Sequence, residues 1–301
     1  MTKIKRWLLA IPIIFVLALI ILVIVTGVRQ NKTVQDQASK INVVSSLNFY
    51  GEMAQAVGGD RVTVTNVIDK ASVDPHEFEP TAVVAKTYQK AQVIISNGGG
   101  YDPWSTNFAK ANSQADSVTV AKLVGYHTGD NEHFWYSADT AKLLTEQLVK
   151  SFTKLDPQNK EQFEKNQQAY LKSLAPLNDL RESIRGQLAG KSVLTTEPVM
   201  DNTLEPLGAK IIVPEFATAV EEGTDPSSAD IRAWHDAIDQ GEVALVIKNK
   251  QTTSKLVDQA VAYAEEKQVP VIGVTETKPD NMSFLKWQEQ QLEAIREALA
   301  Q

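Results

Sequence analysis

Two histidines and two glutamates in this sequence have the residue types and positions of a metal site. His76 lies in the segment D-P-H-E-F-E-P at residues 74–80, where prolines stiffen the backbone on both sides of the histidine. His133 lies in a loop that ends in aromatic residues, and Glu197 and Glu276 each follow a short apolar run. Imidazole nitrogens and carboxylate oxygens together suit a divalent transition metal. The sequence therefore predicts one mixed nitrogen and oxygen metal site.

Each histidine also has an alternative role. A histidine between prolines suits a solvated turn, so His76 taken alone is not diagnostic. His133 taken alone suits a structural histidine as well as a ligand. His127 lies in the same loop among glycine and threonine, and we expect it to be solvated. The prediction thus depends on all four candidates occurring at matching places in the two halves of the chain.

The composition restricts what the protein can bind. The 301 residues carry a net charge of -7 at pH 7 and include no cysteine. An acidic chain lacks the basic face that nucleic acid requires, and the absence of cysteine excludes disulfides, thiolate ligands and thiol nucleophiles. The turn Asn97-Gly98-Gly99-Gly100 lacks the spacing of a phosphate loop, and its glycines are expected to let a strand turn sharply near a cleft. We therefore expect the protein to bind a cation and no nucleic acid. We also expect a monomer.

The N-terminal segment has the pattern of a membrane anchor. Residues 8–28 are continuously apolar and long enough to cross a hydrocarbon core of about 30 Å. Basic residues precede this run, which places the N-terminus inside the cell. A cleaved signal peptide usually has a shorter apolar region and a small-x-small cleavage site. We predict a cytoplasmic tip and transmembrane anchor over residues 1–29, and a tether over residues 30–40 that holds an extracytoplasmic body at the cell membrane.

From residue 41 onward the sequence predicts an α/β fold with two lobes. Short apolar runs alternate with amphipathic helical patterns, which is typical of βαβ units and mainly parallel sheets. Residues 41–156 are predicted to form an N-terminal metal-binding lobe and residues 191–301 a C-terminal one. One long helix over residues 157–190, kinked at Pro176, is predicted to join these Rossmann-like lobes. Strands are expected at residues 41–45, 62–67, 92–96, 117–120, 192–196, 210–213, 242–247 and 270–274.

The four candidate ligands agree with this fold, because ligands bind at the carboxyl ends of parallel strands. The strand ending near residue 196 delivers Glu197, and the strand ending at residue 274 delivers Glu276. An acidic loop with Glu215, Glu221 and Glu222 is expected after the strand at residues 210–213. Each lobe would then offer two ligands to a cleft between them.

Five sequence segments resemble the substrate-binding proteins of zinc and manganese ABC transporters, a group that also contains surface proteins described as adhesins. The segments are D-P-H-E-F-E-P at 74–80, E-H-F-W at 132–135, T-T-E at 195–197, G-T-D-P-S at 223–227 and V-T-E-T at 274–277. The resemblance covers roughly residues 41–299. It implies two α/β lobes, a metal held in the cleft between them, and delivery of that metal to an ABC permease in the membrane.

The sequence departs from this family in two respects. Family members are commonly lipoproteins anchored through a cysteine, whereas this chain has an apolar N-terminal segment. The fourth ligand in the family is often an aspartate, whereas this chain offers Glu276, and Asp280 competes with it for that role.

The ligand types favour manganese over zinc as the transported ion. Zinc-specific relatives tend to add a histidine and a histidine-rich loop between the first two ligands, and only His127 occurs in that interval. Two carboxylates suit a harder ion, although nitrogen and oxygen sites intrinsically bind zinc more tightly than manganese. Zinc and iron therefore remain open. A membrane-anchored metalloenzyme, in which the same groups activate water, and an adhesin braced by metal are the alternative functions. The sequence lacks H-E-x-x-H and G-x-S-x-G motifs, so we expect no enzymatic activity.

Overall fold

The computed structural model describes residues 40–73, 75, 78–252 and 254–300. Residues 41–301 form one compact unit, distinct from residues 1–40. The predicted transmembrane anchor and nearly all of the tether lie outside the described residues. Within the described ranges, no helix combines the length and the apolar character needed to cross a bilayer.

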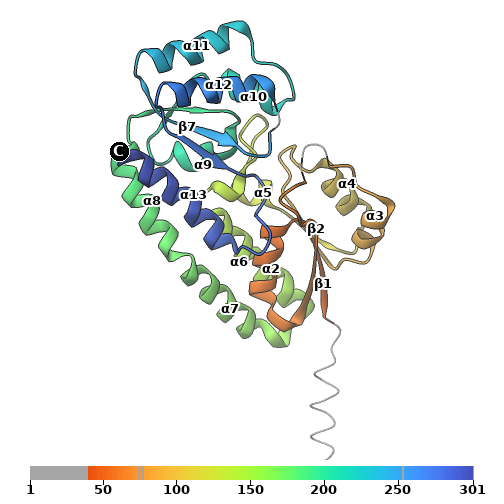
Figure 1. Ribbon diagram of the computed structural model, residues 1–301. Coiled ribbons are helices and arrows are strands. Elements are labelled where there is room, and N and C mark those ends of the chain that lie inside the picture. The colour runs from red at the N-terminus through yellow and green to blue at the C-terminus, as the bar shows by residue number, and fades with distance from the viewer. Residues whose placement is uncertain (1–39, 74, 76–77, 253, 301) are drawn as a thin grey trace, which may run out of the picture. The chain divides into compact units, whose positions relative to one another are not determined.

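The first sheet has four parallel strands in the order β2-β1-β3-β4. Strands β1 and β2 lie side by side in it (Figure 1). Its central strands, β1 and β3, are almost entirely buried and mainly apolar, as is typical of a parallel sheet covered on both faces. Val43, for example, pairs with Val64 on one side and Val93 on the other. The elements of this half are β1 (Ile41–Leu47), α2 (Asn48–Gly58), η1 (Gly59–Arg61), β2 (Val62–Ile68), α3 (Ala82–Gln89), β3 (Val93–Ser96), α4 (Pro103–Ala111), β4 (Asp116–Thr119) and α5 (Val120–Val124).

The second sheet repeats this strand order as β6-β5-β7-β8, and its strands are again parallel. The prediction of two parallel sheets is therefore confirmed. The elements of this half are β5 (Ser192–Thr195), η4 (Pro198–Met200), α9 (Asp201–Leu204), β6 (Lys210–Ile211), α10 (Pro214–Glu221), α11 (Ser228–Asp239), β7 (Val243–Asn249), α12 (Lys255–Glu266), β8 (Val271–Val274) and α13 (Phe284–Leu299).

The acidic segment after β6 is a helix, and the prediction of a loop was wrong there. Pro214 begins α10 at the first helical position, where its missing N–H costs no hydrogen bond. Phe216 and Val220 lie one helical turn apart and are both buried. The acidic residues before and after them, Glu215, Glu221 and Glu222, concealed this periodicity in the sequence.

The connection between the two halves consists of several helices rather than one. It comprises η2 (Phe134–Tyr136), α6 (Thr140–Leu155), η3 (Pro157–Asn159), α7 (Lys160–Ser173) and α8 (Ala175–Leu188). The single long helix predicted over residues 157–190 is divided at Leu174, and Pro176 lies in the first turn of α8. The proline causes the interruption, since it cannot donate a hydrogen bond to the preceding turn. Helix α13 packs along α8 (Figure 1).

One hydrophobic cluster extends through both halves of the unit, beside two smaller clusters of buried residues that each belong to one half. It includes Val43 and Val93 of the first sheet together with Val193 and Leu245 of the second. Because buried residues are continuous between the sheets, the two halves cannot rotate apart without exposing apolar surface to water.

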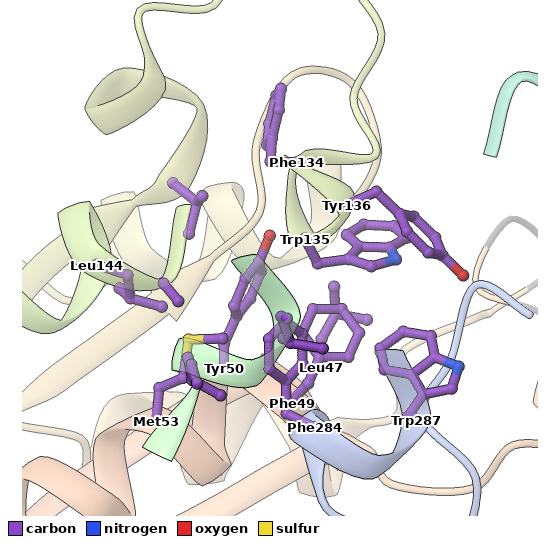
Figure 2. Packing of buried hydrophobic residues seen from close by; sticks show 14 of the residues in the cluster. Leu47, Phe49, Tyr50, Met53, Phe134, Trp135, Tyr136, Leu144, Phe284 and Trp287 are labelled. Atoms are coloured by element: carbon purple, nitrogen blue, oxygen red, sulfur yellow. The ribbon is translucent and has the colours of Figure 1, made fainter. Parts of the chain in front are cut away.

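Aromatic side chains form the centre of this core (Figure 2). The ring of Phe49 on α2 lies 5.0 Å from that of Trp135 and 5.5 Å from that of Trp287 on α13. The ring of Trp287 also lies 5.8 Å from that of Tyr136. Aromatic pairs at such distances contribute about 0.5–1.5 kcal/mol each beyond the burial of their surface. The cluster therefore fastens α2, η2 and α13 together.

Candidate metal site

His133 is fully buried directly before η2, and its orientation is fixed by Asn131. The side-chain oxygen of Asn131 lies 2.9 Å from Nδ1 of His133 and also accepts the backbone N–H of His133 at 2.8 Å. Because an amide oxygen only accepts, Nδ1 carries the proton and Nε2 carries the lone pair. Among the described residues, Nε2 has no hydrogen-bond partner. A buried nitrogen lone pair of this kind is a suitable donor for a metal ion.

Two carboxylates flank the Nε2 atom of His133. Glu221 Oε1 lies 3.7 Å away and Glu276 Oε2 lies 3.8 Å away, both too far for a good hydrogen bond. Donors that share one ion at bond lengths of about 2.0–2.2 Å lie roughly 3–4 Å apart. Burial by itself lowers the pKa of His133, but Glu276 and Glu221 outweigh it and raise that pKa above its ordinary value. The surroundings thus favour a positive charge at this nitrogen, whether a proton or a metal ion supplies it.

Glu276 follows β8 and is held by three contacts. Tyr101 donates its hydroxyl proton to Oε2 at 3.1 Å, and Asn249 donates to Oε1 at 2.6 Å. The backbone N–H of Glu276 donates to the side-chain oxygen of Gln251 at 2.7 Å. Asp280, the competing candidate, is about half exposed and lies 3.6 Å from the Nζ atom of Lys70. The structure therefore places Glu276, and not Asp280, beside the buried histidine.

Glu197 follows β5 and is tied to Glu276 through Asn249, the last residue of β7. The amide nitrogen of Asn249 donates to both carboxylates, and Thr252 donates its hydroxyl proton to the other oxygen of Glu197. Burial raises the pKa of Glu197, the hydrogen bonds from Asn249 and Thr252 oppose this rise, and the charge of Glu276 adds to it. One amide thus holds two buried carboxylates close together, which is costly unless a cation joins them.

Three consecutive glycines form the sharp turn predicted for residues 97–100, and this turn brings Tyr101 to the site. Gly98, the first of them, has a φ of 76°, and a Cβ there would lie 2.6 Å from a side-chain carbon of Thr119. The backbone N–H groups of Asn97 and Gly98 each donate to Asp102 at 2.7 Å, which closes the turn. Burial, and secondarily the charge of Glu276, raise the pKa of Tyr101 well above its usual value. Tyr101 therefore keeps its proton and acts as a hydrogen-bond donor.

His76 lies outside the described residues, so its role as a ligand stays a prediction. The residues just before it are tied to the loop that carries Glu276. The side-chain nitrogen of Gln251 donates to the carbonyl oxygens of Ala71 at 3.1 Å and Val73 at 3.4 Å, while its oxygen accepts from Glu276. Over the described part of the chain, no three His, Asp or Glu side chains form a complete metal site.

Several residues of the site were missed by the sequence analysis. Asn131, Asn249 and Gln251 have amide side chains, which carry no charge to mark them, and Tyr101 is one of seven tyrosines. The available signal was position: Asn249 ends a strand, just as Glu197 and Glu276 follow strands. His127 is exposed, as expected for a solvated histidine, with its Nδ1 atom 3.5 Å from Asp130.

Comparisons with known proteins give matches to one family model, to curated relatives and to solved structures. Residues 43–298 match the family described as "Zinc-uptake complex component A periplasmic". The manganese ABC transporter substrate-binding lipoprotein ScaA of Streptococcus gordonii is 27% identical over 164 residues, 50% of this chain and 53% of that protein. The iron ABC transporter substrate-binding lipoprotein MtsA of Streptococcus pyogenes serotype M1 is 27% identical over 179 residues, 54% of this chain and 57% of that protein. The matched part is thus less than two thirds of either relative.

Among solved structures, the fold is similar to that of a Mn-bound periplasmic metal binding protein from Candidatus Liberibacter asiaticus. The TM-score is 0.69 at 19% sequence identity, and the match covers 86% of this chain and 100% of that one. The similarity supports the fold, with two parallel sheets, over nearly the whole of the described unit.

Proposed function

Because the chain belongs to the zinc-uptake complex component A family, we propose that it captures a divalent transition metal between its two α/β halves and delivers it to an ABC permease. The family consists of solute-binding proteins and not of enzymes, so the metal is cargo. The ligands proposed are His76, His133, Glu197 and Glu276.

The observation that carries this proposal is the environment of His133. Its Nε2 atom is buried, points a lone pair between carboxylates, and has no hydrogen-bond partner among the described residues. A buried polar atom without a partner costs free energy, about 1–3 kcal/mol in proteins. A bound metal ion would satisfy this nitrogen and neutralise the adjacent carboxylates at the same time.

We propose manganese rather than zinc as the principal cargo. Carboxylates outnumber histidines around the described part of the site, and hard oxygen donors suit Mn²⁺ better than the tetrahedral arrangement that zinc prefers. The names of the two streptococcal relatives mention manganese and iron, whereas the family name mentions zinc. Competition between the ions is therefore the decisive measurement.

The direct test is metal analysis of protein purified without added metal, followed by isothermal titration of the metal-free body with Mn²⁺, Zn²⁺ and Fe²⁺. We expect one tight site per chain. A body that binds none of these ions, or binds several equivalents weakly, contradicts the proposal. A deletion strain that still imports manganese and zinc at the normal rate contradicts the transport role even if the site binds metal.

We also propose that residues 8–28 anchor the body to the cell membrane as a single helix. The support is the length and apolar character of this run and the lack of a cysteine that could carry a lipid. Such an anchor would keep the body beside its permease at high effective concentration. The test is membrane fractionation with alkaline carbonate. The full chain should stay in the membrane pellet, whereas a variant without residues 1–29 should be released.

A further inference from the structure

Glu221 is as close to the buried histidine as the predicted ligand Glu276 is. Its Oε1 atom lies 3.7 Å from His133 Nε2, compared with 3.8 Å for Glu276 Oε2. The sequence pattern places Glu221 in an acidic loop and indicates no role for it. The independent sign of a ligand is the nitrogen itself, which is fully buried and has no hydrogen-bond partner among the described residues.

The position of Glu221 is fixed by the packing of α10, of which it is the last residue. The ring of Phe216 lies 4.4 Å from that of Trp234, and both side chains are fully buried. The helix then ends sharply: the backbone N–H of Gly223 donates to the carbonyl oxygen of Val220 at 3.0 Å, and Gly223 has a φ of 69°. The Glu221 carboxylate is therefore held over the site by a rigid element.

Glu221 also differs from Glu276 in exposure. The side chain of Glu221 is 15% exposed, whereas that of Glu276 is 3% exposed and that of His133 is 1% exposed. Glu221 is thus the carboxylate on the solvent side of the histidine, where an arriving ion would meet it before it reached Glu276.

We infer that Glu221 is an additional metal ligand on the solvent side of His133. It would add a fifth ligand, and a third carboxylate, to the proposed set of His76, His133, Glu197 and Glu276. This inference rests on the proposed function and sharpens it towards ion selectivity. A third carboxylate gives Mn²⁺ or Fe²⁺ the five or six donors they accept, whereas Zn²⁺ is satisfied by four. Glu221 therefore contributes more to the affinity for manganese than to the affinity for zinc.

The test compares Glu221→Gln with Glu222→Gln, a matched change at the neighbouring exposed position. The affinities of the metal-free body for Mn²⁺ and Zn²⁺ are measured by competition titration. We expect Glu221→Gln to weaken Mn²⁺ binding at least about tenfold, since changes around metal sites typically cost 10–100-fold. The loss for Zn²⁺ should be clearly smaller, and Glu222→Gln should bind both ions as the unchanged protein does.

The visible absorption of the Co²⁺-loaded protein separates ligation from a simple charge effect. Loss of a ligand in Glu221→Gln should lower the coordination number of Co²⁺ and so strengthen its d–d absorption. Glu221→Asp keeps the negative charge on a side chain that is one methylene shorter and does not reach the ion, so its spectrum should change in the same way. Equal losses for both ions with an unchanged Co²⁺ spectrum, or no loss at all, would overturn the inference. An unchanged protein that binds no divalent metal would instead overturn the proposed function itself.

Discussion

Replacing Asn131 by alanine should weaken metal binding although Asn131 is not itself a ligand. The side-chain oxygen of Asn131 accepts from Nδ1 of His133 and so directs the Nε2 lone pair into the site. Without this acceptor, the imidazole can place its proton on either nitrogen and can turn. Hydrogen bonds of this kind to a ligating histidine typically contribute 10–100-fold in affinity. At about 1.4 kcal/mol per factor of ten, the loss corresponds to about 1.4–2.8 kcal/mol of binding free energy.

The same residue has a structural role that must be separated from this effect. Asn131 also accepts the backbone N–H of His133, and its amide nitrogen donates to the carbonyl oxygen of Pro198 at 2.5 Å, directly after Glu197. Asn131→Asp is the comparison variant, because it keeps an acceptor for His133 while it replaces the donor to Pro198 by a negatively charged oxygen. A carboxylate makes the imidazole a stronger base, so Asn131→Asp should bind Mn²⁺ at least as tightly as the unchanged protein.

The assay is titration of the metal-free body with Mn²⁺, together with tryptophan fluorescence to verify folding. Folded Asn131→Ala with an affinity within about twofold of the unchanged protein would refute the reasoning. Equal weakening in Asn131→Ala and Asn131→Asp would also refute it, since the contact with Pro198 would then be the important one.

Three further predictions concern stability. Asn249→Asp should lower the free energy of unfolding of the metal-free body at about pH 8 by about 1–3 kcal/mol, because a carboxylate replaces the amide that donates to Glu197 and Glu276. Urea unfolding should show this loss of stability, and the loss should be no larger when Mn²⁺ is present. Burial, with the nearby charges of Glu205 and Glu221, raises the pKa of Asp201 to about 7. Between its unfolded pKa of about 3.9 and this value the folded state binds the proton more tightly, so stability is highest in acid and falls as the pH rises towards 7. The urea midpoint of the metal-free body should therefore fall from about pH 5 to pH 8, and Asp201→Asn should reduce this change; an equally steep fall in that variant would contradict the assignment. Trp287→Ala should cost about 3–5 kcal/mol, as expected for a fully buried tryptophan. Because the core is shared, calorimetry should still show one transition, and two separate transitions would argue against a continuous core.

Much of the fold could be predicted from the sequence because its signals are local. The apolar strand runs alternate with helical patterns along the whole body, and this alternation indicates parallel sheets whose carboxyl ends hold Glu197 and Glu276. The helix break at Leu174 was foreseen only as a kink at Pro176. A proline marks the place of an interruption, but whether the helix bends or divides depends on packing around it.

The rest of the site could not be predicted because it depends on contacts between distant segments. Tyr101 meets Glu276 across 175 positions of sequence, and no local pattern encodes that meeting. The preference for His133 over His127 came from the neighbouring aromatic residues, and the structure gives its reason: Trp135 and Tyr136 are buried in the shared core. Glu221 was overlooked because acidic residues hid the helix that positions it.

The side chain of Gln251 links the backbone of Glu276 to the segment that precedes His76, and this link bears on how a bound metal would be released. Its oxygen accepts from the backbone N–H of Glu276, and its nitrogen donates to Ala71, in the segment that leads to His76. Under the proposed transport function, a permease that pulled this segment outward would loosen the backbone of Glu276 through the same amide. Breaking such a hydrogen bond costs only about 0.5–1.5 kcal/mol net, whereas turning one half of the body against the other would expose the aromatic core. Unloading would then be a movement of two loops around a nearly rigid protein.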